Sequence, residues 1–230
     1  MDRILLLKKS AEISNSCIPL IKKLLKKKIS EIELAKEIEK NIITKGAKPA
    51  FEIIVASGKR SSKIHAKPTK RIINGIGFID FGASYKGYKS DLTIPFIKGK
   101  ISKEEEKIIN ATIEAYTIAK KEIKVNKNCW EVYEKVNDFL KSKGFFLKHS
   151  LGHGVGIRIH QLPIIGKPMK KLKKKEIEKL KKLKFKENMV FTIEPGVYVK
   201  GIGGCRIENT FLLKKDKLVK LTNAKLLKIK

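Results

Sequence analysis

Four acidic residues lie inside short apolar segments that have the composition of β-strands. Asp80 and Asp91 flank a turn rich in tyrosine and glycine, and Glu194 and Glu208 occupy two later segments of the same kind. Acidic side chains are depleted in strands, and burying them without partners is costly. Unpaired carboxylates in an apolar environment raise one another's pKa, and some of them stay protonated. A chain with this pattern must therefore compensate these four charges with Lys, Arg or bound cations.

His153 extends this acidic set, because it lies in the glycine-rich sequence Leu-Gly-His-Gly-Val-Gly. Four carboxylates and one neutral imidazole carry a charge of about −4, which two divalent cations would neutralise. Oxygen-rich ligation with one nitrogen suits Mn, Co, Fe or Zn better than it suits a metal that prefers thiolates. Any one of these residues alone is best explained as a surface group with an ordinary polar partner. The five together favour a metal site.

Capping signals and apolar spacing predict four helices. Their starts are marked by Asp2, by Asn128 and by the capping-box pairs Ser30–Glu33 and Ser102–Glu105. Strands are expected at residues 51–56, 78–82, 92–97, 145–148, around 153–160, and at 190–193, 196–199 and 205–213. Two helices followed by strands, twice over, predict an α+β domain of two similar halves, although no sequence repeat proves a duplication.

The charge of the chain invites a nucleic-acid interpretation. The 230 residues include 53 Lys and Arg against 23 Asp and Glu, a formal net charge of +30. Only five of the basic residues are Arg, whereas phosphate and base recognition favours the bidentate arginine fork. Lysine also recurs from end to end, which indicates a general composition bias as much as a binding face. We therefore expect nucleic acid to bind only incidentally through the basic surface.

A lysine-rich insert at about 167–187 stands apart from the rest of the chain. Leu172, Ile177, Leu180 and Leu183 are spaced roughly as on a helix. We expect a solvated surface helix inserted between two strands. The alternative is a basic helix that contacts a membrane surface or RNA.

Cysteine usage and hydropathy predict a cytoplasmic protein. Cys17, Cys129 and Cys205 form an odd, widely spaced set, which argues against a disulfide framework. No stretch approaches the ~20 apolar residues of a membrane span, and no signal-peptide core is present. We therefore expect no membrane partner.

The acidic set and His153 occur in the order and spacing of a known family. The spacings are Asp80-x10-Asp91, His160 seven residues after His153, and Glu-Pro-Gly followed by Arg-x-Glu at Glu194 and Glu208. The sequence thereby resembles the pita-bread metallopeptidases (peptidase family M24), which include methionine aminopeptidase, aminopeptidase P and prolidase. The resemblance implies one catalytic domain over 1–230, with two pseudo-symmetric α/β halves around a curved antiparallel sheet. It also implies peptide substrates and leaves a homodimer open.

The resemblance also implies roles for individual residues. Asp80 would bind one of two divalent ions (Mn, Co, Fe or Zn), Asp91 and Glu208 would bridge both, and His153 and Glu194 would complete the second site. Glu194 would also shuttle a proton to the leaving nitrogen, and His160 would hydrogen-bond the developing oxyanion. His65 would bind substrate, with a surface-loop histidine as the alternative. Arg206 is expected to hold the Glu208 carboxylate through a charge-assisted bond.

Several segments resemble the aminopeptidase P and prolidase branch, which implies removal of an N-terminal residue ahead of proline. They are Ser57–Ser61 with His65 downstream, the run Tyr85–Thr93, the sequence His149-Ser-Leu-Gly-His153, and the sequence Ile193–Tyr198. Ile94, Gln161 and Asn209 depart from the pattern of the branch, although none of them replaces a metal ligand. We expect no separate N-terminal domain of the kind typical of the branch, which keeps methionine aminopeptidase as an alternative. A further alternative is a pita-bread protein without turnover that binds peptides or RNA.

Overall fold

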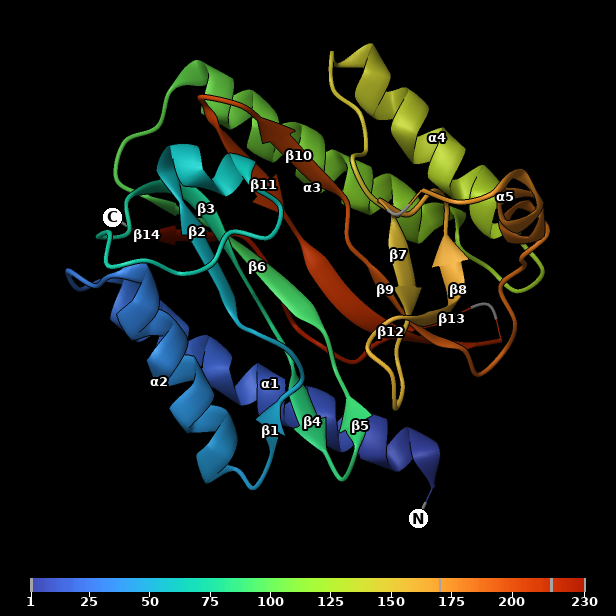
Figure 1. The fold of residues 1–230 in the computed structure, drawn as a ribbon, viewed down its shortest axis with the longest axis horizontal. Coiled ribbons are helices and arrows are strands. Elements are labelled where there is room, and N and C mark those ends of the chain that lie inside the picture. Colours follow the sequence, from blue (N-terminus) through green and yellow to red (C-terminus); the bar gives the residue numbers. More distant parts are fainter. Residues whose placement is uncertain (1, 170, 216, 230) are drawn as a thin grey trace.

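The computed structural model describes residues 2–169, 171–215 and 217–229. Its centre is a curved sheet whose strands run in the order β2-β3-β6-β12-β9-β7-β8 (Figure 1). These strands are Ile54–Ser57 (β2), Gly75–Phe81 (β3), Leu92–Lys98 (β6), Glu208–Lys214 (β12), Val190–Ile193 (β9), Gly152–Gly154 (β7) and Gln161–Ile165 (β8). Neighbours along this order are antiparallel. The expected α+β pita-bread architecture is confirmed.

Shorter strands complete the sheets. Lys217–Lys220 (β13) pairs with β12, and Leu227–Ile229 (β14) pairs in parallel with β6. Lys48–Pro49 (β1), Ala83–Tyr85 (β4) and Tyr88–Lys89 (β5) form a small separate sheet. Gly196–Val199 (β10) and Gly203–Arg206 (β11) form a hairpin.

Two helix pairs cover different halves of the sheet. Helices α1 (Arg3–Leu25) and α2 (Glu31–Thr44) pack in one apolar cluster with β2, β3 and β6. Helices α3 (Lys103–Glu122) and α4 (Cys129–Ser142) pack in a second cluster with β9, β11 and β12. Each half therefore combines a helix pair with part of the common sheet, as the repeated order of helices and strands predicted.

The helices begin where the sequence signals placed them. The Asp2 side chain accepts from the backbone N–H of Ile4, and the Asn128 side chain accepts from that of Trp130. The pairs Ser30–Glu33 and Ser102–Glu105 form complete capping boxes at α2 and α3. Each cap satisfies a backbone N–H that the first helical turn leaves without a partner.

Strands β3 and β6 form the expected antiparallel pair, and the chain between them folds back through β4 and β5. A Cβ at Gly82 would lie 1.9 Å from the backbone oxygen of Ser90, so this crossing requires glycine. At the tip of the β4–β5 hairpin, Gly87 has a φ of +85° with open space around it. The close approach of Gly82 to Ser90 therefore helps to fix the backbone position of Asp91, the next residue in the chain.

Some expectations about local structure were wrong, including the single strand expected at 205–213, which is divided between β11 and β12. Residues 145–148 form no strand, because the backbone N–H of Leu147 bonds to the Asn137 side chain instead of a neighbouring strand. The strand expected around 153–160 ends at Gly154, and the chain then turns before β8. The helix expected in the lysine-rich insert is limited to α5 (Lys174–Lys181). In another part of the chain, the short 3-10 helix η1 (Gly58–Ser62) was not expected from the sequence.

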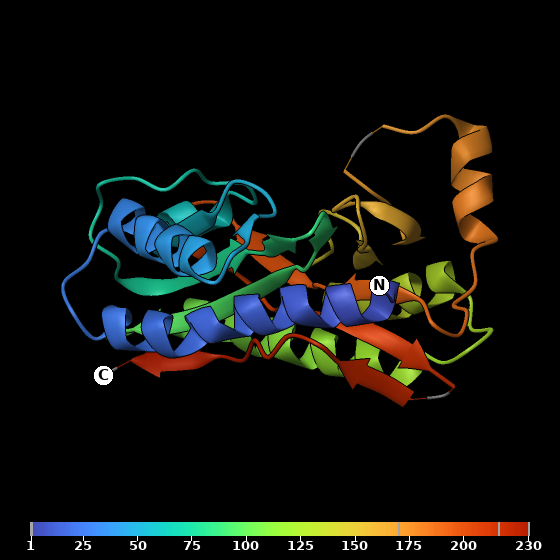
Figure 2. The same cartoon turned by 90° about the horizontal axis from the view of Figure 1, so that it is seen from below.

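Helix α5 is solvated, as expected. It buries none of its residues, and Figure 2 shows it standing apart from the sheet at the edge of the molecule. The helix stops early because the backbone around Phe185 pairs with the chain before α4, where the N–H of Phe185 donates to the carbonyl of Lys127.

The three cysteines are free and buried, which agrees with the expected absence of a disulfide framework. Among the described residues, no helix combines the length and apolar character needed to cross a membrane.

Candidate metal centre

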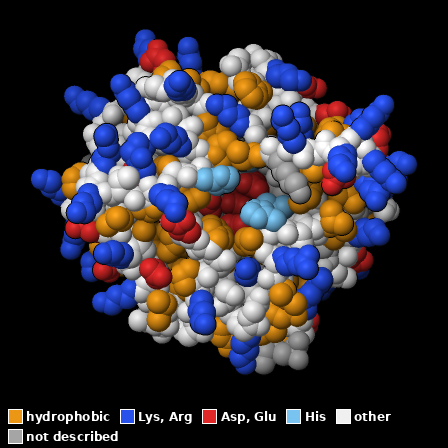
Figure 3. Space-filling model, viewed as in Figure 1, with side chains coloured by type: hydrophobic (Ala, Val, Ile, Leu, Met, Phe, Trp, Pro, Cys, Tyr) orange, Lys and Arg blue, Asp and Glu red, His pale blue; other side chains and the backbone are white. Residues whose placement is uncertain are grey.

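Five adjacent strands each bring one of the five expected donors to the same cavity. Asp80 lies on β3, Asp91 immediately before β6, Glu208 at the start of β12, Glu194 immediately after β9, and His153 on β7. Because the strand order is β3-β6-β12-β9-β7, residues far apart in the chain become lateral neighbours. All five line a cavity of about 330 Å³. Figure 3 shows its acidic floor with histidine side chains on both sides.

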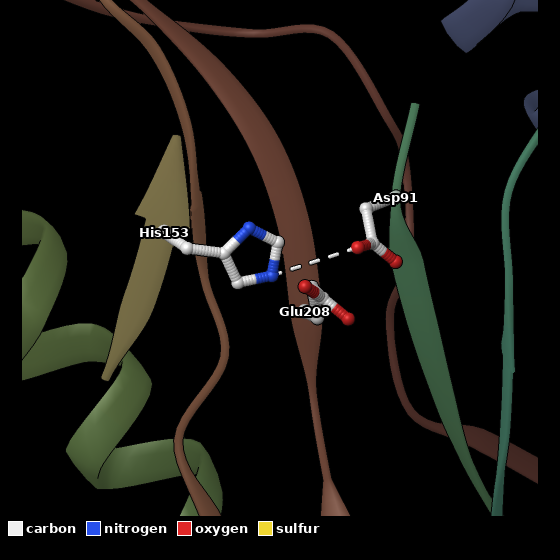
Figure 4. A group of neighbouring side chains, drawn as sticks. All are labelled: Asp91, His153 and Glu208. Atoms are coloured by element: carbon white, nitrogen blue, oxygen red, sulfur yellow. Dashed lines mark ion pairs between the residues drawn. The ribbon is translucent and has the colours of Figure 1, made fainter. Parts of the chain in front are cut away.

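Asp91, His153 and Glu208 form the tightest part of the centre. Each offers a donor atom, and these atoms all lie within 4.8 Å of one another (Figure 4). His153 Nε2 lies 3.6 Å from Asp91 Oδ2 and 3.3 Å from Glu194 Oε1. The three residues of the tight group are buried. His153 Nε2 therefore lies within 4 Å of a carboxylate oxygen of both Asp91 and Glu194.

The protein leaves two carboxylate oxygens of the centre without hydrogen-bond donors. Among the described residues, Asp80 Oδ1 and Glu208 Oε1 are buried and lack a partner. Buried polar atoms are ordinarily satisfied, so an orphaned carboxylate oxygen that faces a cavity calls for a cation.

Electrostatics at the centre are unfavourable for the protein alone. Burial, together with the neighbouring carboxylates, raises the pKa of Asp91 and of Glu194 well above the usual range. Burial and the charge of Asp80 raise the pKa of Glu208 to about 8. Burial and the nearby His160 lower the pKa of His153 to about 3, so its imidazole is neutral. A neutral imidazole beside crowded carboxylates fits divalent cations, which would restore the charged form of the acids.

Arg206 supplies a buried positive charge, but it does not hold Glu208 as expected. Its Nη2 donates to Asp80 Oδ2 at 2.5 Å, and its Nε donates to Thr93 Oγ1 at 3.2 Å. The Thr93 hydroxyl in turn donates to Glu208 Oε2 at 2.7 Å. The expectation was wrong because Arg206 lies on β11, which packs against β3, whereas Glu208 begins the next strand beside β6. Arg206 is therefore linked to Glu208 by two hydrogen bonds that share the Thr93 hydroxyl.

His149 belongs to a buried hydrogen-bonded chain with Tyr198 and Arg206, which was not predicted from the sequence. Arg206 Nη1 donates to the Tyr198 hydroxyl at 2.7 Å, and that hydroxyl lies 2.9 Å from His149 Nε2. The Nδ1 atom of His149 lies 2.8 Å from the carbonyl oxygen of Ser150, which places the ring proton on Nδ1. Burial and the Arg206 charge lower the pKa of His149 to about 3. The sequence did contain a signal for His149. It lies four residues before His153, and all four histidines of the chain fall in the motif segments.

His65 and His160 lie at the rim of the same cavity and are exposed to solvent. The rings of His160 and His153 meet edge to face, with their centroids 4.3 Å apart. The lining of the cavity is otherwise largely apolar and includes Phe51, Ile54, Ile64, Ile159 and Ile164. A peptide end would therefore meet apolar walls, a histidine rim and an acidic floor.

Comparison with known proteins identifies the family. Residues 6–215 match the model of metallopeptidase family M24. The chain belongs to this family. The match covers every residue of the candidate centre.

The relatives of this M24 chain include named peptidases. An uncharacterized peptidase of Methanocaldococcus jannaschii is 40% identical over 98% of this chain and 63% of its own length. The Xaa-Pro dipeptidase of Pyrococcus furiosus is 33% identical over 96% of this chain and 62% of its own length. The name of the second relative belongs to the aminopeptidase P and prolidase branch. The chain spans less than two thirds of their length.

Solved structures show the same fold. The prolidase from Pyrococcus horikoshii OT3 superimposes with a TM-score of 0.87 at 30% identity, covering 97% of this chain and 62% of the other. The X-Pro aminopeptidase from Thermotoga maritima MSB8 gives a TM-score of 0.86 at 31% identity, covering 99% of this chain and 63% of the other.

Proposed function

We propose that this chain is a dinuclear metal-dependent aminopeptidase or dipeptidase that hydrolyses an N-terminal peptide bond ahead of proline. The observation that carries the proposal is the convergence of five metal-ligand side chains from five neighbouring strands on one cavity. The names of its relatives, which include Xaa-Pro dipeptidases, support the substrate class. One catalytic domain over 1–230, with an insert at about 167–187, is part of the same proposal.

The donor set suggests how two divalent ions would be shared. Asp80 and Glu208 each have one oxygen engaged by protein donors and one left over, so each can offer a lone oxygen to a cation. We assign Asp80 to one ion, Asp91 and Glu208 to both, and His153 and Glu194 to the other, with Mn, Co, Fe or Zn as candidates. When bound, the ions would polarise the scissile carbonyl and lower the pKa of water to near neutrality.

The remaining chemistry belongs to side chains of this protein. Glu194 lines the cavity with its Oε1 3.3 Å from His153 Nε2, so we assign its carboxylate the transfer of a proton to the leaving nitrogen. His160 stands at the rim beside His153, where its ring can donate to the developing oxyanion. His65 lies on the same rim and is assigned to substrate binding.

The other expectations about setting remain proposals of the same kind. We expect a cytoplasmic protein that acts on peptides, with a homodimer as one candidate assembly and nucleic acid as an incidental partner. The names of the relatives support the prolidase branch over methionine aminopeptidase.

Hydrolysis of Xaa-Pro and Met-Ala peptides by the protein loaded with Mn or Co tests the proposal. We expect cleavage of the Xaa-Pro substrate and a loss of at least about 100-fold in kcat/KM for Asp91→Asn. Asp138→Asn, which alters only an exposed ion pair with Lys141, is the matched control and should retain full activity. Cleavage of Met-Ala alone would support methionine aminopeptidase, and no cleavage of either peptide would refute the enzyme assignment.

A further inference from the structure

A fully buried carboxylate lies outside the metal centre, at the first position of α2. The side chain of Glu31 is completely inaccessible to solvent. Its Oε1 accepts from the N–H and the hydroxyl of Ser57, at 2.9 and 3.0 Å. Its Oε2 accepts from the N–H and the hydroxyl of Thr69, at 3.1 and 2.8 Å, and from Arg60 Nε at 3.3 Å. All five donors lie outside α2, whereas a capping side chain accepts from backbone N–H groups in the first turn of its own helix. The Glu31 carboxylate therefore does not act as a helix cap.

These contacts join both ends of one connection between strands β2 and β3. Ser57 ends β2 and Thr69 lies near the far end of the connection, so the single carboxylate spans the segment 57–69. Arg60 adds a second bridge, because its Nη2 donates to the carbonyl of Lys67 at 2.6 Å. The backbone of Ile32 also donates to the carbonyl of Thr69. The connection is therefore fastened at its base to the N-terminus of α2.

The middle of this segment forms part of the cavity. Ile64 and His65 line it, and the carbonyl of Ile64 accepts from Arg206 Nη1 at 3.3 Å. Ser61 Oγ also accepts from the N–H of Gly204 at 2.7 Å. Glu31 therefore holds the two ends of the segment, and the middle of the segment contacts β11. His65 lies in the chain between the contact with β11 and the contact of Thr69 with Glu31.

We infer that Glu31 is a positioning residue, whose buried carboxylate fixes segment 57–69 so that His65 faces the substrate cavity. The inference rests on the proposed peptidase function for its catalytic readout. Glu31 lines no part of the cavity and acts through the segment that it holds. Glutamine at this position has the same shape but only one acceptor oxygen, so the backbone N–H of Ser57 or of Thr69 would face an NH2 group and lose its acceptor.

The first test compares kinetics of Glu31→Gln with those of Glu33→Gln in metal-loaded protein. Glu33 lies on the same helical turn, is exposed, and bonds only within its capping box with Ser30, where glutamine also serves. We expect Glu31→Gln to raise KM for an Xaa-Pro dipeptide about tenfold with kcat changed less than about threefold, and Glu33→Gln to change neither. Equal KM values for the wild type and Glu31→Gln would overturn the inference.

A double variant tests whether the effect of Glu31 on KM depends on His65. If Glu31 acts by placing His65, adding Glu31→Gln to His65→Ala should raise KM by less than about twofold. A full additional tenfold increase would contradict positioning of His65.

Hydrogen–deuterium exchange of the metal-free protein gives a readout that needs no catalysis. Glu31→Gln should speed backbone exchange in 57–69 by at least about fivefold, with α3 and α4 unchanged and Glu33→Gln matching the wild type. If the Gln variant fails to fold, Thr69→Val removes one donor more gently and should act in the same direction, whereas Thr69→Ser should not. Unchanged exchange in the segment would overturn the inference. Absence of hydrolysis by the wild type would refute the proposed function alone and leave this readout decisive.

Discussion

At the residue scale, the centre is a set of acids that the protein itself only partly neutralises. Arg206 is buried among them and contacts Asp80, Thr93 and Tyr198. A buried ion pair that loses one partner leaves an uncompensated charge in a medium of low polarity. Arg206 is therefore central to the stability of the protein before any metal binds.

Replacing Arg206 tests this dependence. Arg206→Met keeps much of the side-chain volume but leaves Asp80 and Tyr198 without their donor, and we expect it to lower the free energy of unfolding by about 3 kcal/mol. Urea unfolding of the metal-free protein measures the change, with Arg71→Met at an exposed site as the control. A loss as small as that of the control would show that Arg206 is dispensable.

The raised pKa of Glu208 predicts how stability varies with pH in the absence of metal. A carboxyl whose pKa is raised on folding stabilises the protein below its unfolded pKa, and this contribution is lost as pH rises through the folded value of about 8. His149 and His153, with pKa lowered to about 3, have the opposite dependence, which is complete once pH exceeds their unfolded value near 6.5. From about pH 6.5 to 8 the dependence therefore comes from the carboxyl groups with a raised pKa, which are Glu208, Asp91 and Glu194.

We expect metal-free protein to lose unfolding free energy between pH 6.5 and 8, and up to about 2 kcal/mol of this loss belongs to Glu208. Urea midpoints in EDTA at the two pH values measure it, and Glu208→Gln should weaken the dependence, while Asp91 and Glu194 keep its sign. With saturating Mn the trend should reverse, because the ions bind the deprotonated acids. Stability that rises with pH in EDTA would contradict the assigned shift.

At the element scale, local signals determined the helices better than the strands. The caps at Ser30 and Ser102 depend on residues three apart, so their geometry is present in the sequence. The absence of a strand at 145–148 depends on Asn137, which bonds to Leu147 only once α4 is packed. Likewise α5 ends where Phe185 joins the core, which helical spacing cannot anticipate.

The crossing at Gly82 gives a test at this scale. Gly82→Ala would push a Cβ to 1.9 Å from the Ser90 oxygen and displace the chain that leads into Asp91. We expect a loss of about 2–3 kcal/mol in unfolding free energy, together with weaker metal binding. The control Gly87→Ala meets open space and should cost only about 1 kcal/mol for its positive φ. Equal losses in the two variants, measured by chemical unfolding, would argue against the crossing as a constraint.

At the scale of the whole molecule, the sheet order explains why the donors could be predicted and their partners could not. Acidic residues in apolar segments are visible in the sequence, as is a histidine among glycines. The Arg206 contacts require the placement of β11 against β3, and the His149 contact requires Tyr198 from β10. Such pairings across the fold leave no local pattern, so Arg206 was assigned to its sequence neighbour Glu208.

The central claim is that two divalent ions compensate the acids gathered by β3, β6, β12, β9 and β7. Anomalous diffraction from crystals soaked in manganese tests it most directly. We predict two peaks in the cavity of the wild type, one beside Asp80 and one beside His153, and loss of the second peak in His153→Ala. Crystals of the wild type with no manganese peak among these side chains would contradict the claim.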